Sequence, residues 1–285
     1  MNYTEVGLDL QGVAKRIYFN LQYKSAFFKM LNPAYIQELR NTGTPSIEVV
    51  KTNSMSLSSR ATVEIAEALT PSSVGYTPVK VDLTECRLGY SLKIPVLITG
   101  TNFTNALTSA MEKKDSAVAK AIDTYGFGKL ANDANITERE WDPSTHQDYV
   151  DLITALTADL FNNDVYDGYT LALSATEYAK YVAALTSVLK YETMAGIEGV
   201  DRGTVARAYG VDAFQVNDTV LGSGIKGYFF NPIAVVGDTF FDKFVQFNGD
   251  YPGYPGNYVM EGNILFGAKV VEENAIFRLV DEVSA

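Results

Sequence analysis

The longest regular hydrophobic pattern in the sequence is helical and lies between residues 102 and 126. Its apolar members recur at spacings of three and four: Phe103, Leu107, Ala110, Met111, Val118, Ala121, Ile122 and Tyr125. The pattern predicts a helix capped by Asn102 or Thr104 and stopped by Gly126. At about 1.5 Å per residue, roughly twenty-two residues make a rod about 33 Å long. We expect the opposite side to be a solvated face, carrying Glu112, Lys113, Asp115, Lys120 and Asp123.

Two shorter amphipathic helices are predicted in the middle of the chain. Each begins with a capping box, Ser144-x-x-Gln147 for the first and Ser174-x-x-Glu177 for the second. The apolar stripes that follow are Tyr149, Ile153, Leu156 and Leu160, and then Tyr178, Tyr181, Val182, Leu185, Val188 and Leu189. We expect the first helix to end near Asn162 and a short strand, Tyr169–Leu173, to lead into the second.

Between Pro45 and Pro95 the pattern changes to the two-residue alternation that is typical of strands. Its apolar positions are Ile47, Val49, Val79, Val81 and Leu83, and then, with opposite parity, Cys86, Leu88, Tyr90, Leu92 and Ile94. A bulge near Thr84–Glu85 would keep one face apolar throughout. A two-stranded ribbon is only marginally stable alone. We therefore expect this ribbon to take its packing from a neighbouring subunit.

The two ends of the chain are less regular. The first forty residues mix aromatic and basic side chains and resemble an arm, with a short helix around Ile36–Leu39. The region after residue 205 predicts short strands with turns at Gly210, at Asn231–Pro232 and in the loop 248–257. No Gly/Ser-rich linker separates two bodies, so the expected class is α+β, with lobes that share strands.

Charge and composition change this picture in one respect. The 23 Lys and Arg residues against 34 Asp and Glu residues give a net charge of −11, which opposes adhesion to nucleic acid or anionic lipid. Charged residues are 20% of the chain, whereas Tyr (18) and Phe (15) are plentiful. Protein interfaces are depleted of charged residues and enriched in aromatic residues. This composition therefore suits a self-associating chain as well as it suits a tyrosine-rich monomer. The lack of a long apolar run or a signal-peptide pattern predicts a soluble protein made in the cytoplasm.

Candidate chemistry is sparse. A single cysteine, Cys86, and a single histidine, His146, exclude an intrachain disulfide and multi-His metal centres. We interpret Cys86 as a small, half-buried strand residue and His146 as a structural residue in a first helical turn. The segment 126–130 lacks the Ser or Thr of a phosphate loop, and 163–174 lacks the ligands of a calcium loop. We expect no catalytic residue, cofactor or metal.

One alternative from another class remains open. The carboxylates of Asp238, Asp242 and Asp250 are of the type that glycoside hydrolases use. The tyrosine-rich loop from Asp250 to Tyr258 would suit stacking on sugar rings or a contact between subunits. A carbohydrate-binding or glycoside-hydrolysing enzyme is therefore an alternative, although we favour the subunit contact.

The order of an arm, a ribbon, a spine helix and a mixed lobe resembles the major capsid proteins of tailed bacteriophages with the Hong Kong 97 fold. Residues 169–178 (YTLALSATEY) are similar to the strand and helix of the family's axial domain. Residues 205–218 (VARAYGVDAFQVND) resemble its gly-x-pro-val strand that ends in Asn or Ser and Asp, without the usual proline before Val211. Residues 264–279 (ILFGAKVVEENAIFRL) resemble its closing strands.

This resemblance implies a division of the chain into four parts. These are an amino-terminal arm (1–44), an extended β-ribbon loop (45–98), a peripheral domain with the spine helix (99–141 and 257–285), and an axial domain (142–256). It further implies a structural, non-enzymatic protein that assembles into hexamers and pentamers of an icosahedral shell around double-stranded DNA, without sequence-specific binding and without a membrane. An encapsulin-like compartment would share the fold.

The resemblance also implies partners, a location and contact residues. We expect a separate scaffolding protein, because no long charged helical prefix precedes the arm, together with a portal and a decoration protein. The location would be the virion, after assembly in the bacterial host cytoplasm. The candidates for subunit contacts are Arg16, Tyr18, Phe19, Ile47, Val49, Arg60, Val79, Val81, Asp250, Tyr251 and Tyr254.

Overall fold

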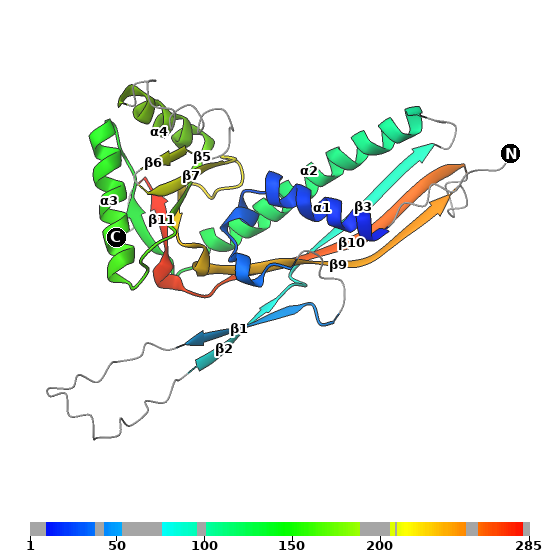
Figure 1. Cartoon of the computed structure of the whole chain (residues 1–285), viewed down its shortest axis with the longest axis horizontal. Helices are drawn as coiled ribbons and strands as arrows, with labels where there is room; N and C mark the ends of the chain where they lie inside the picture. Colours follow the sequence, from blue (N-terminus) through cyan, green and yellow to red (C-terminus); the bar gives the residue numbers. More distant parts are fainter. Residues whose placement is uncertain are drawn as a thin grey trace, which may run out of the picture.

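The structure is a computed structural model that describes residues 10–37, 43–52, 76–95, 101–188, 206–208, 210–248 and 256–281. The chain forms an elongated body with a mixed α/β lobe at one end and a projecting ribbon (Figure 1). Helices and strands follow one another without segregation into separate domains, and the predicted α+β class is confirmed. In the described part of the chain, no helix is long and apolar enough to cross a membrane.

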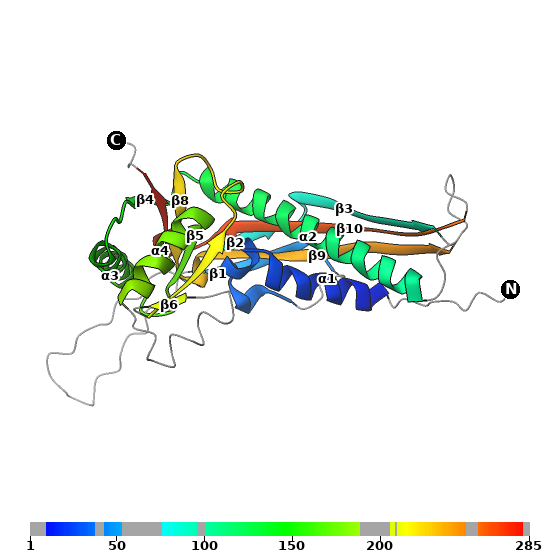
Figure 2. The ribbon, with the colours of Figure 1, turned by 90° about the horizontal axis from the view of Figure 1, so that it is seen from above.

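The elongated body is built on a three-stranded antiparallel sheet. Its strand order is β3-β10-β9, formed by β3 (Cys86–Pro95), β10 (Asn257–Val270) and β9 (Val235–Asn248). Helices α2 (Thr101–Ala131) and α1 (Leu10–Lys24) lie side by side over one face of this sheet (Figures 1 and 2). The ribbon, which consists of β1 (Ser46–Thr52) and β2 (Tyr76–Asp82), leaves from the other face (Figure 1).

The lobe at the end is built on a six-stranded mixed sheet with the order β4-β11-β8-β5-β7-β6. Its strands are β4 (Thr137–Glu140), β5 (Thr170–Ser174), β6 (Ala206–Ala208), β7 (Val211–Val216), β8 (Ile225–Phe230) and β11 (Ile276–Val280). Two helices, α3 (His146–Asn162) and α4 (Ala175–Val188), complete the lobe.

The two sheets exchange strands in a way that differs from the predicted division. β9 lies inside the predicted axial segment, yet it pairs with β10 in the sheet of the elongated body. β4 and β11 lie inside the predicted peripheral segments, yet they belong to the six-stranded sheet. The chain therefore passes between the sheets from β8 to β9 and back from β10 to β11, which couples the lobes without a linker.

The ribbon is shorter than predicted. β1 and β2 pair antiparallel with Ile47 opposite Val81 and Val49 opposite Val79. The next strand, β3, leaves them after a turn at residues 83–85 and pairs with β10 instead. The predicted bulge at Thr84–Glu85 is therefore wrong: the parity changes because the chain moves to another sheet. The segment 53–75 lies outside the described residues.

Helix α2 is longer than its predicted end at Gly126, and it continues to Ala131. A Cβ atom at Gly126 would overlap the ring of Phe27, so this glycine gives space for a contact and does not stop the helix. The predicted solvated face is also wrong in part. Asp115 and Asp123 are buried, because α1 and the segment after it cover that side of α2.

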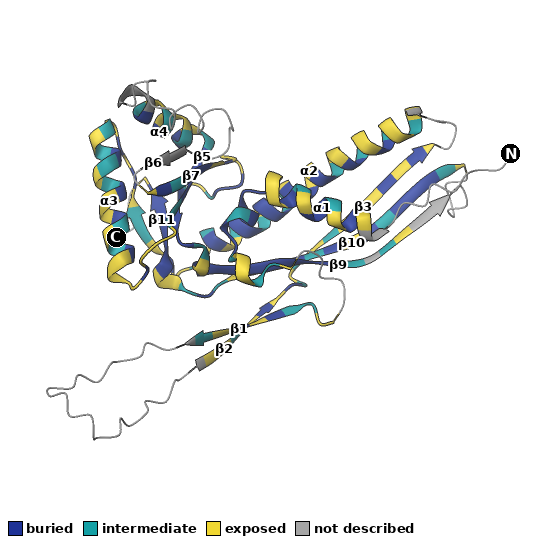
Figure 3. Ribbon diagram, in the orientation of Figure 1, coloured by how far each residue is buried: buried dark blue, intermediate teal, exposed yellow. Residues whose placement is uncertain are grey.

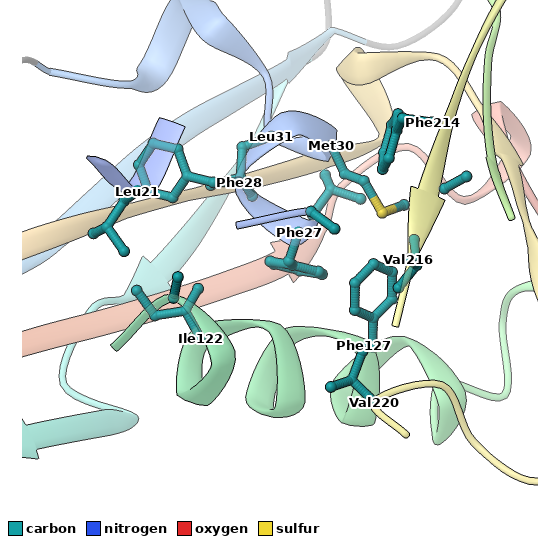
Figure 4. Close-up of a cluster of buried hydrophobic side chains, with 14 of the residues drawn as sticks. Leu21, Phe27, Phe28, Met30, Leu31, Ile122, Phe127, Phe214, Val216 and Val220 are labelled. Atoms are coloured by element: carbon teal, nitrogen blue, oxygen red, sulfur yellow. The ribbon is translucent and has the colours of Figure 1, made fainter. Parts of the chain in front are cut away.

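The amino-terminal segment is not a free arm. Helix α1 buries Val13, Ala14, Ile17, Tyr18 and Leu21 in the main core. The short 3-10 helices η1 (Phe27–Met30) and η2 (Pro33–Tyr35) follow. The helix predicted at Ile36–Leu39 does not begin at Ile36, which is extended, and residues 38–39 lie outside the described residues. The side chains of η1 lie between α2, which carries Ile122 and Phe127, and β7, which carries Phe214 and Val216 (Figure 4). Residues 10–37 therefore join the two lobes.

The predicted caps of α3 and α4 are nearly correct, whereas Asn102 and Thr104, the predicted caps of α2, lie inside that helix. Thr145, one residue after the predicted Ser144, is the N-cap of α3, and Asp148 completes the capping box. The predicted end of α3 at Asn162 is confirmed. At the start of α4 the hydroxyl of Ser174 accepts a hydrogen bond from the backbone N–H of Glu177, at 3.2 Å. Gly210, with φ of +78°, makes the predicted turn between β6 and β7.

Candidate functional site

The described ribbon is anchored on its own chain. Ile47, Val49, Val81 and Leu83 form a separate apolar cluster with Val236 and Phe240 of β9 and with Val271, on the sheet face opposite α2. The ammonium group of Lys51 adds a hydrogen bond to the carbonyl oxygen of Val271 at 3.1 Å and an ion pair with Glu272 at 3.1 Å. The prediction that this segment depends on a neighbouring subunit is therefore wrong for the base of the ribbon.

The other face of the ribbon is open. Val50 is 54% exposed, and its register partner Pro78 is exposed beside it. Glu48 and Lys80, which pair in the same ladder, are exposed on this face as well. Figure 3 shows exposed residues alternating with buried ones along both strands. The ribbon thus has one face packed in the monomer and one face available for contacts.

A polar cluster fixes the turn between the ribbon and β3 to α2, the predicted spine helix. The Glu85 carboxylate pairs with the Lys129 ammonium at 2.5 Å and accepts a hydrogen bond from the Tyr125 hydroxyl. Burial acts to raise the pKa of Glu85, but the hydrogen bonds from Lys129 and Tyr125 together hold it below its ordinary value. Glu85 is therefore ionised at neutral pH, and the turn is held by a charged contact.

Arg278 of β11 makes a second set of polar contacts at the same, C-terminal end of α2. Its guanidinium donates to the carbonyl oxygens of Leu130 and Asp133 at 2.6 and 2.7 Å, and to the Glu138 carboxylate at 2.9 Å. Two of these contacts satisfy carbonyl groups at and just beyond the helix C-terminus, where a cation is favourable. The six-stranded sheet is thereby locked to the spine helix.

Exposed aromatic side chains gather at two places. Phe19 and Tyr23, four residues apart on α1, are 49% and 77% exposed. Phe161 at the end of α3 and Tyr166 in the following turn are also exposed, and their ring centroids lie 4.9 Å apart in an edge-to-face arrangement. The Tyr166 hydroxyl donates to Asp164 at 2.8 Å, which orients the pair. Ordered, exposed aromatics are typical of protein contact surfaces.

The structure separates the predicted contact residues. Phe19 is exposed, and Arg16 and Val79 are half-buried. Tyr18, Ile47, Val49 and Val81 are buried in the same chain, so their apolar surface is already covered without a partner. Arg60, Asp250, Tyr251 and Tyr254 lie outside the described residues. Sequence reasoning missed Tyr23, Val50, Phe161 and Tyr166; a helical reading of residues 10–24 would have placed Tyr23 one turn after Phe19.

The candidate residues for chemistry occupy positions in which they contribute to the fold. Cys86 is half-buried on β3, as predicted, and burial raises the pKa of its thiol. His146 is the first residue of α3, as predicted. Asp238 is fully buried and accepts hydrogen bonds from the backbone N–H groups of Gln37 and Thr239. Among the described residues, no three His, Cys, Asp or Glu side chains gather as a metal site.

We expect Phe240→Ala to loosen the ribbon more than the body. The truncation leaves a cavity in the small cluster at the ribbon base, so it weakens the packing that holds β1 and β2 and leaves the main core unchanged. Hydrogen exchange measured by mass spectrometry should therefore accelerate in β1 and β2 and change less in α2. Val50→Ala, on the open face, is the control; equal exchange in the two variants would contradict this account of the anchor.

Comparison with known proteins bears on the fold. No protein-family model and no curated protein sequence matches this chain. The structure is similar to that of a protein of Mycobacterium phage Che8, with 16% identity, a TM-score of 0.59 and 90% of each chain covered. It is also similar to a chain in the capsid of the cyanophage P-SCSP1u, with 14% identity, a TM-score of 0.59, and 91% and 89% of the two chains covered.

A third similar structure is not described as a phage capsid. It is a virus-like particle from Pyrococcus furiosus, with 13% identity, a TM-score of 0.52, and 95% of this chain and 100% of that chain covered. All three likenesses extend over nearly the whole length of both chains, so they concern the complete architecture of spine helix, ribbon and lobe. The chain therefore has the Hong Kong 97 fold, the fold of tailed-bacteriophage major capsid proteins.

Proposed function

We propose that this chain is a structural shell protein, the major capsid protein of a tailed bacteriophage or prophage, that assembles into hexamers and pentamers of an icosahedral shell around double-stranded DNA. The observation that carries the proposal is the likeness of nearly the whole chain to a protein in the capsid of a cyanophage. At 14% identity this likeness concerns the fold, and the assembly is our inference from it.

The exposed surfaces of the single chain support self-assembly. β1 and β2 pair only with each other in the described part of the chain, so each has a free hydrogen-bonding edge that can accept another strand. The aromatic pairs Phe19–Tyr23 and Phe161–Tyr166 lie on different parts of the molecule. Contacts between two different patches of identical chains generate closed rings when the rotation closes. Capsomers are assemblies of this kind.

The remaining partners follow from the same proposal. A separate scaffolding protein, a portal and a decoration protein would associate with the shell, and its location would be the virion after assembly in the host cytoplasm. The function would be structural and not enzymatic. The alternative that uses Asp238 and Asp242 as hydrolytic carboxylates is disfavoured, because Asp238 has no exposed surface and its carboxylate is bound to backbone groups.

The size of the purified protein tests this proposal. We expect size-exclusion chromatography with light scattering to show assemblies in the megadalton range, and negative-stain microscopy to show closed shells of uniform diameter. Weak or scaffold-dependent assembly would appear as hexamers and pentamers. A chain that stays monomeric at high concentration, and after co-expression with the genes that flank it, would contradict the proposal.

A second candidate is a cellular compartment that encloses protein instead of DNA. It is supported by the likeness to the virus-like particle from Pyrococcus furiosus, which covers 95% of this chain. The contents of the shells decide between the two candidates. Nuclease-protected DNA in purified particles is expected for a capsid, whereas a co-purifying enzyme in particles free of nucleic acid would favour the compartment.

A further inference from the structure

One layer of this acidic chain has a positive net charge. We use the term helical layer for residues 10–37 and 101–131, which contain α1, η1, η2 and α2. The helical layer has eight Lys and Arg residues and three Asp and Glu residues. The rest of the chain has 15 and 31, out of totals of 23 and 34. The helical layer therefore carries a formal charge of +5, and the rest of the chain carries a formal charge of −16.

Burial increases this asymmetry. Two of the three acidic residues in the helical layer, Asp115 and Asp123, are buried and bind groups of their own chain. Glu112 is left as the one exposed acid of the layer. Outside the helical layer, five described cations are paired with carboxylates, in Lys51–Glu272, Arg139–Asp159, Lys180–Glu177, Lys226–Asp281 and Arg278–Glu138.

Three exposed lysines of the helical layer lie along one line. Lys113, Ser116 and Lys120 occupy one face of α2, since they are separated by three and four residues. The ammonium group of Lys24, at the end of α1, reaches this face of α2 between Lys113 and Lys120. It donates to the Ser116 hydroxyl at 3.0 Å and to the Glu112 carbonyl oxygen at 3.3 Å. Lys24, Lys113 and Lys120 form what we term the lysine stripe. In the described part of the chain, Lys113 and Lys120 make no ion pair with a carboxylate.

The spacing of the lysine stripe suits the phosphates of a nucleic acid. Lys113 and Lys120 are seven residues apart, which is about 10.5 Å along a helix with a rise of 1.5 Å per residue. One strand of a DNA duplex has a phosphate about every 3.4 Å along the axis, so the stripe spans about three successive phosphates. Lysine binds phosphate as a point charge and reads no base, so such a contact is independent of sequence.

We propose that the lysine stripe binds the phosphate backbone of double-stranded DNA and that the helical layer is the face that the shell turns towards its contents. The proposal rests on the proposed function for the identity of the polyanion, whereas the charge asymmetry belongs to the chain itself. The net charge of −11 limits the strength of the contact, so the DNA is held weakly and stays mobile. The ribbon, which leaves from the opposite face of the sheet, would then lie on the outer side (Figure 1).

The test compares two triple variants of the full chain with equal net charge. The first removes the lysine stripe, Lys24→Gln with Lys113→Gln and Lys120→Gln. The control removes three exposed lysines outside the helical layer, Lys80→Gln with Lys93→Gln and Lys269→Gln. Unassembled protein from the size-exclusion column is titrated into a short fluorescent DNA duplex, and binding is followed by anisotropy between about 50 and 200 mM salt.

We expect the stripe variant to bind at least about tenfold more weakly at low salt and to show a shallower salt dependence, because each lost phosphate contact reduces the slope of log K against log salt by about 0.9. The control variant should stay within about threefold of the wild type. The inference is overturned if the wild type does not bind the duplex, if both variants lose affinity equally, or if polyglutamate binds more tightly than DNA, which would indicate an acidic protein partner.

Shells purified from expressing cells give a second readout that separates this inference from the proposed function. If the stripe variant forms shells with a reduced content of protected DNA, both proposals are supported. If it forms shells with unchanged DNA content, the inference fails while the proposed function stands. If no variant assembles but the wild type still binds DNA through the stripe, the proposed function fails and the phosphate contact remains. Unchanged melting temperatures of both variants show that neither result reflects misfolding.

Discussion

Replacing Phe27 with alanine should lower the free energy of unfolding by about 3–5 kcal/mol, one of the two largest effects that we expect from a single substitution. Phe27 is fully buried, and its ring packs edge-to-face on Phe127 of α2 at 5.4 Å and on Phe266 of β10 at 6.0 Å. The ring also packs on Gly126, where the Cβ atom of any other residue type would overlap it. The truncation therefore leaves a cavity where the amino-terminal segment, the spine helix and the sheet meet. Chemical denaturation measures the loss.

The matched control is Phe19→Ala. Phe19 is nearly half exposed on α1, so its removal should change the free energy of unfolding by no more than about 0.5 kcal/mol. The two variants also separate stability from assembly: Phe19→Ala should alter association if the aromatic face of α1 is a contact surface, while the fold remains intact. If Phe27→Ala were as mild as Phe19→Ala, residues 10–37 would be an arm after all, as the sequence pattern predicts.

Predictions from the sequence are correct where the contacting residues lie close together along the chain, and they fail where these residues are far apart in sequence. The apolar stripe from Phe103 to Tyr125 predicts α2 correctly, because helical periodicity is a local property. The predicted end of α2 at Gly126 is wrong. Glycine often ends a helix, but here Gly126 lies inside α2 and gives space for the ring of Phe27. That function is set by Phe27, a residue about one hundred positions away, and no local pattern records such a contact.

The same reason explains the error in the charged face. Asp115 and Asp123 have the spacing of solvated residues, but their partners are Asn20 and Ser25, which are 95 and 98 positions away. The helix that covers them, α1, has its own stripe of Val13, Ala14, Ile17, Tyr18 and Leu21. That signal is present in the sequence, and the exposed aromatic and basic residues between its members conceal it. The charge segregation that defines the helical layer follows from the same docking, so net charge could not predict it.

Strand pairing was predictable only where neighbours in sequence pair. The register of β1 with β2 keeps the apolar phases of both strands on one face, as their alternation requires. β3 alternates equally well, but its partner β10 lies more than 160 residues away, so the local pattern at Thr84–Glu85 predicts a bulge where the chain in fact moves to another sheet. The assignment of β9 to one sheet and of β11 to the other likewise cannot be predicted from the alternation of apolar and polar residues.

Asp123→Ala should also lower the free energy of unfolding by about 3–5 kcal/mol. The buried Asp123 carboxylate accepts hydrogen bonds from the Ser25 hydroxyl at 2.5 Å and from the backbone N–H groups of Phe27 at 2.9 Å and Ala26 at 3.2 Å. These donors lie at and before the start of η1, and alanine would leave all three without a partner in a buried place. Glu112→Ala, an exposed acid on the same helix, is the control and should change the free energy of unfolding little. Urea denaturation of the two variants compares these losses directly.

The pH dependence of this difference gives the sharper test, because it distinguishes a buried carboxylate from a mere packing role. Burial raises the pKa of Asp123, against the opposing effect of its hydrogen bonds, above the value of about 3.9 that an aspartate has in an unfolded chain. The folded state therefore takes up the proton more readily than the unfolded state, and the stability that Asp123 contributes decreases as the pH rises through the folded pKa. We accordingly expect the difference in unfolding free energy between the wild type and Asp123→Ala to be larger near pH 4 than at pH 7. A difference that grows with pH would show that ionised Asp123 is favoured by the fold, and the account of its burial would be wrong.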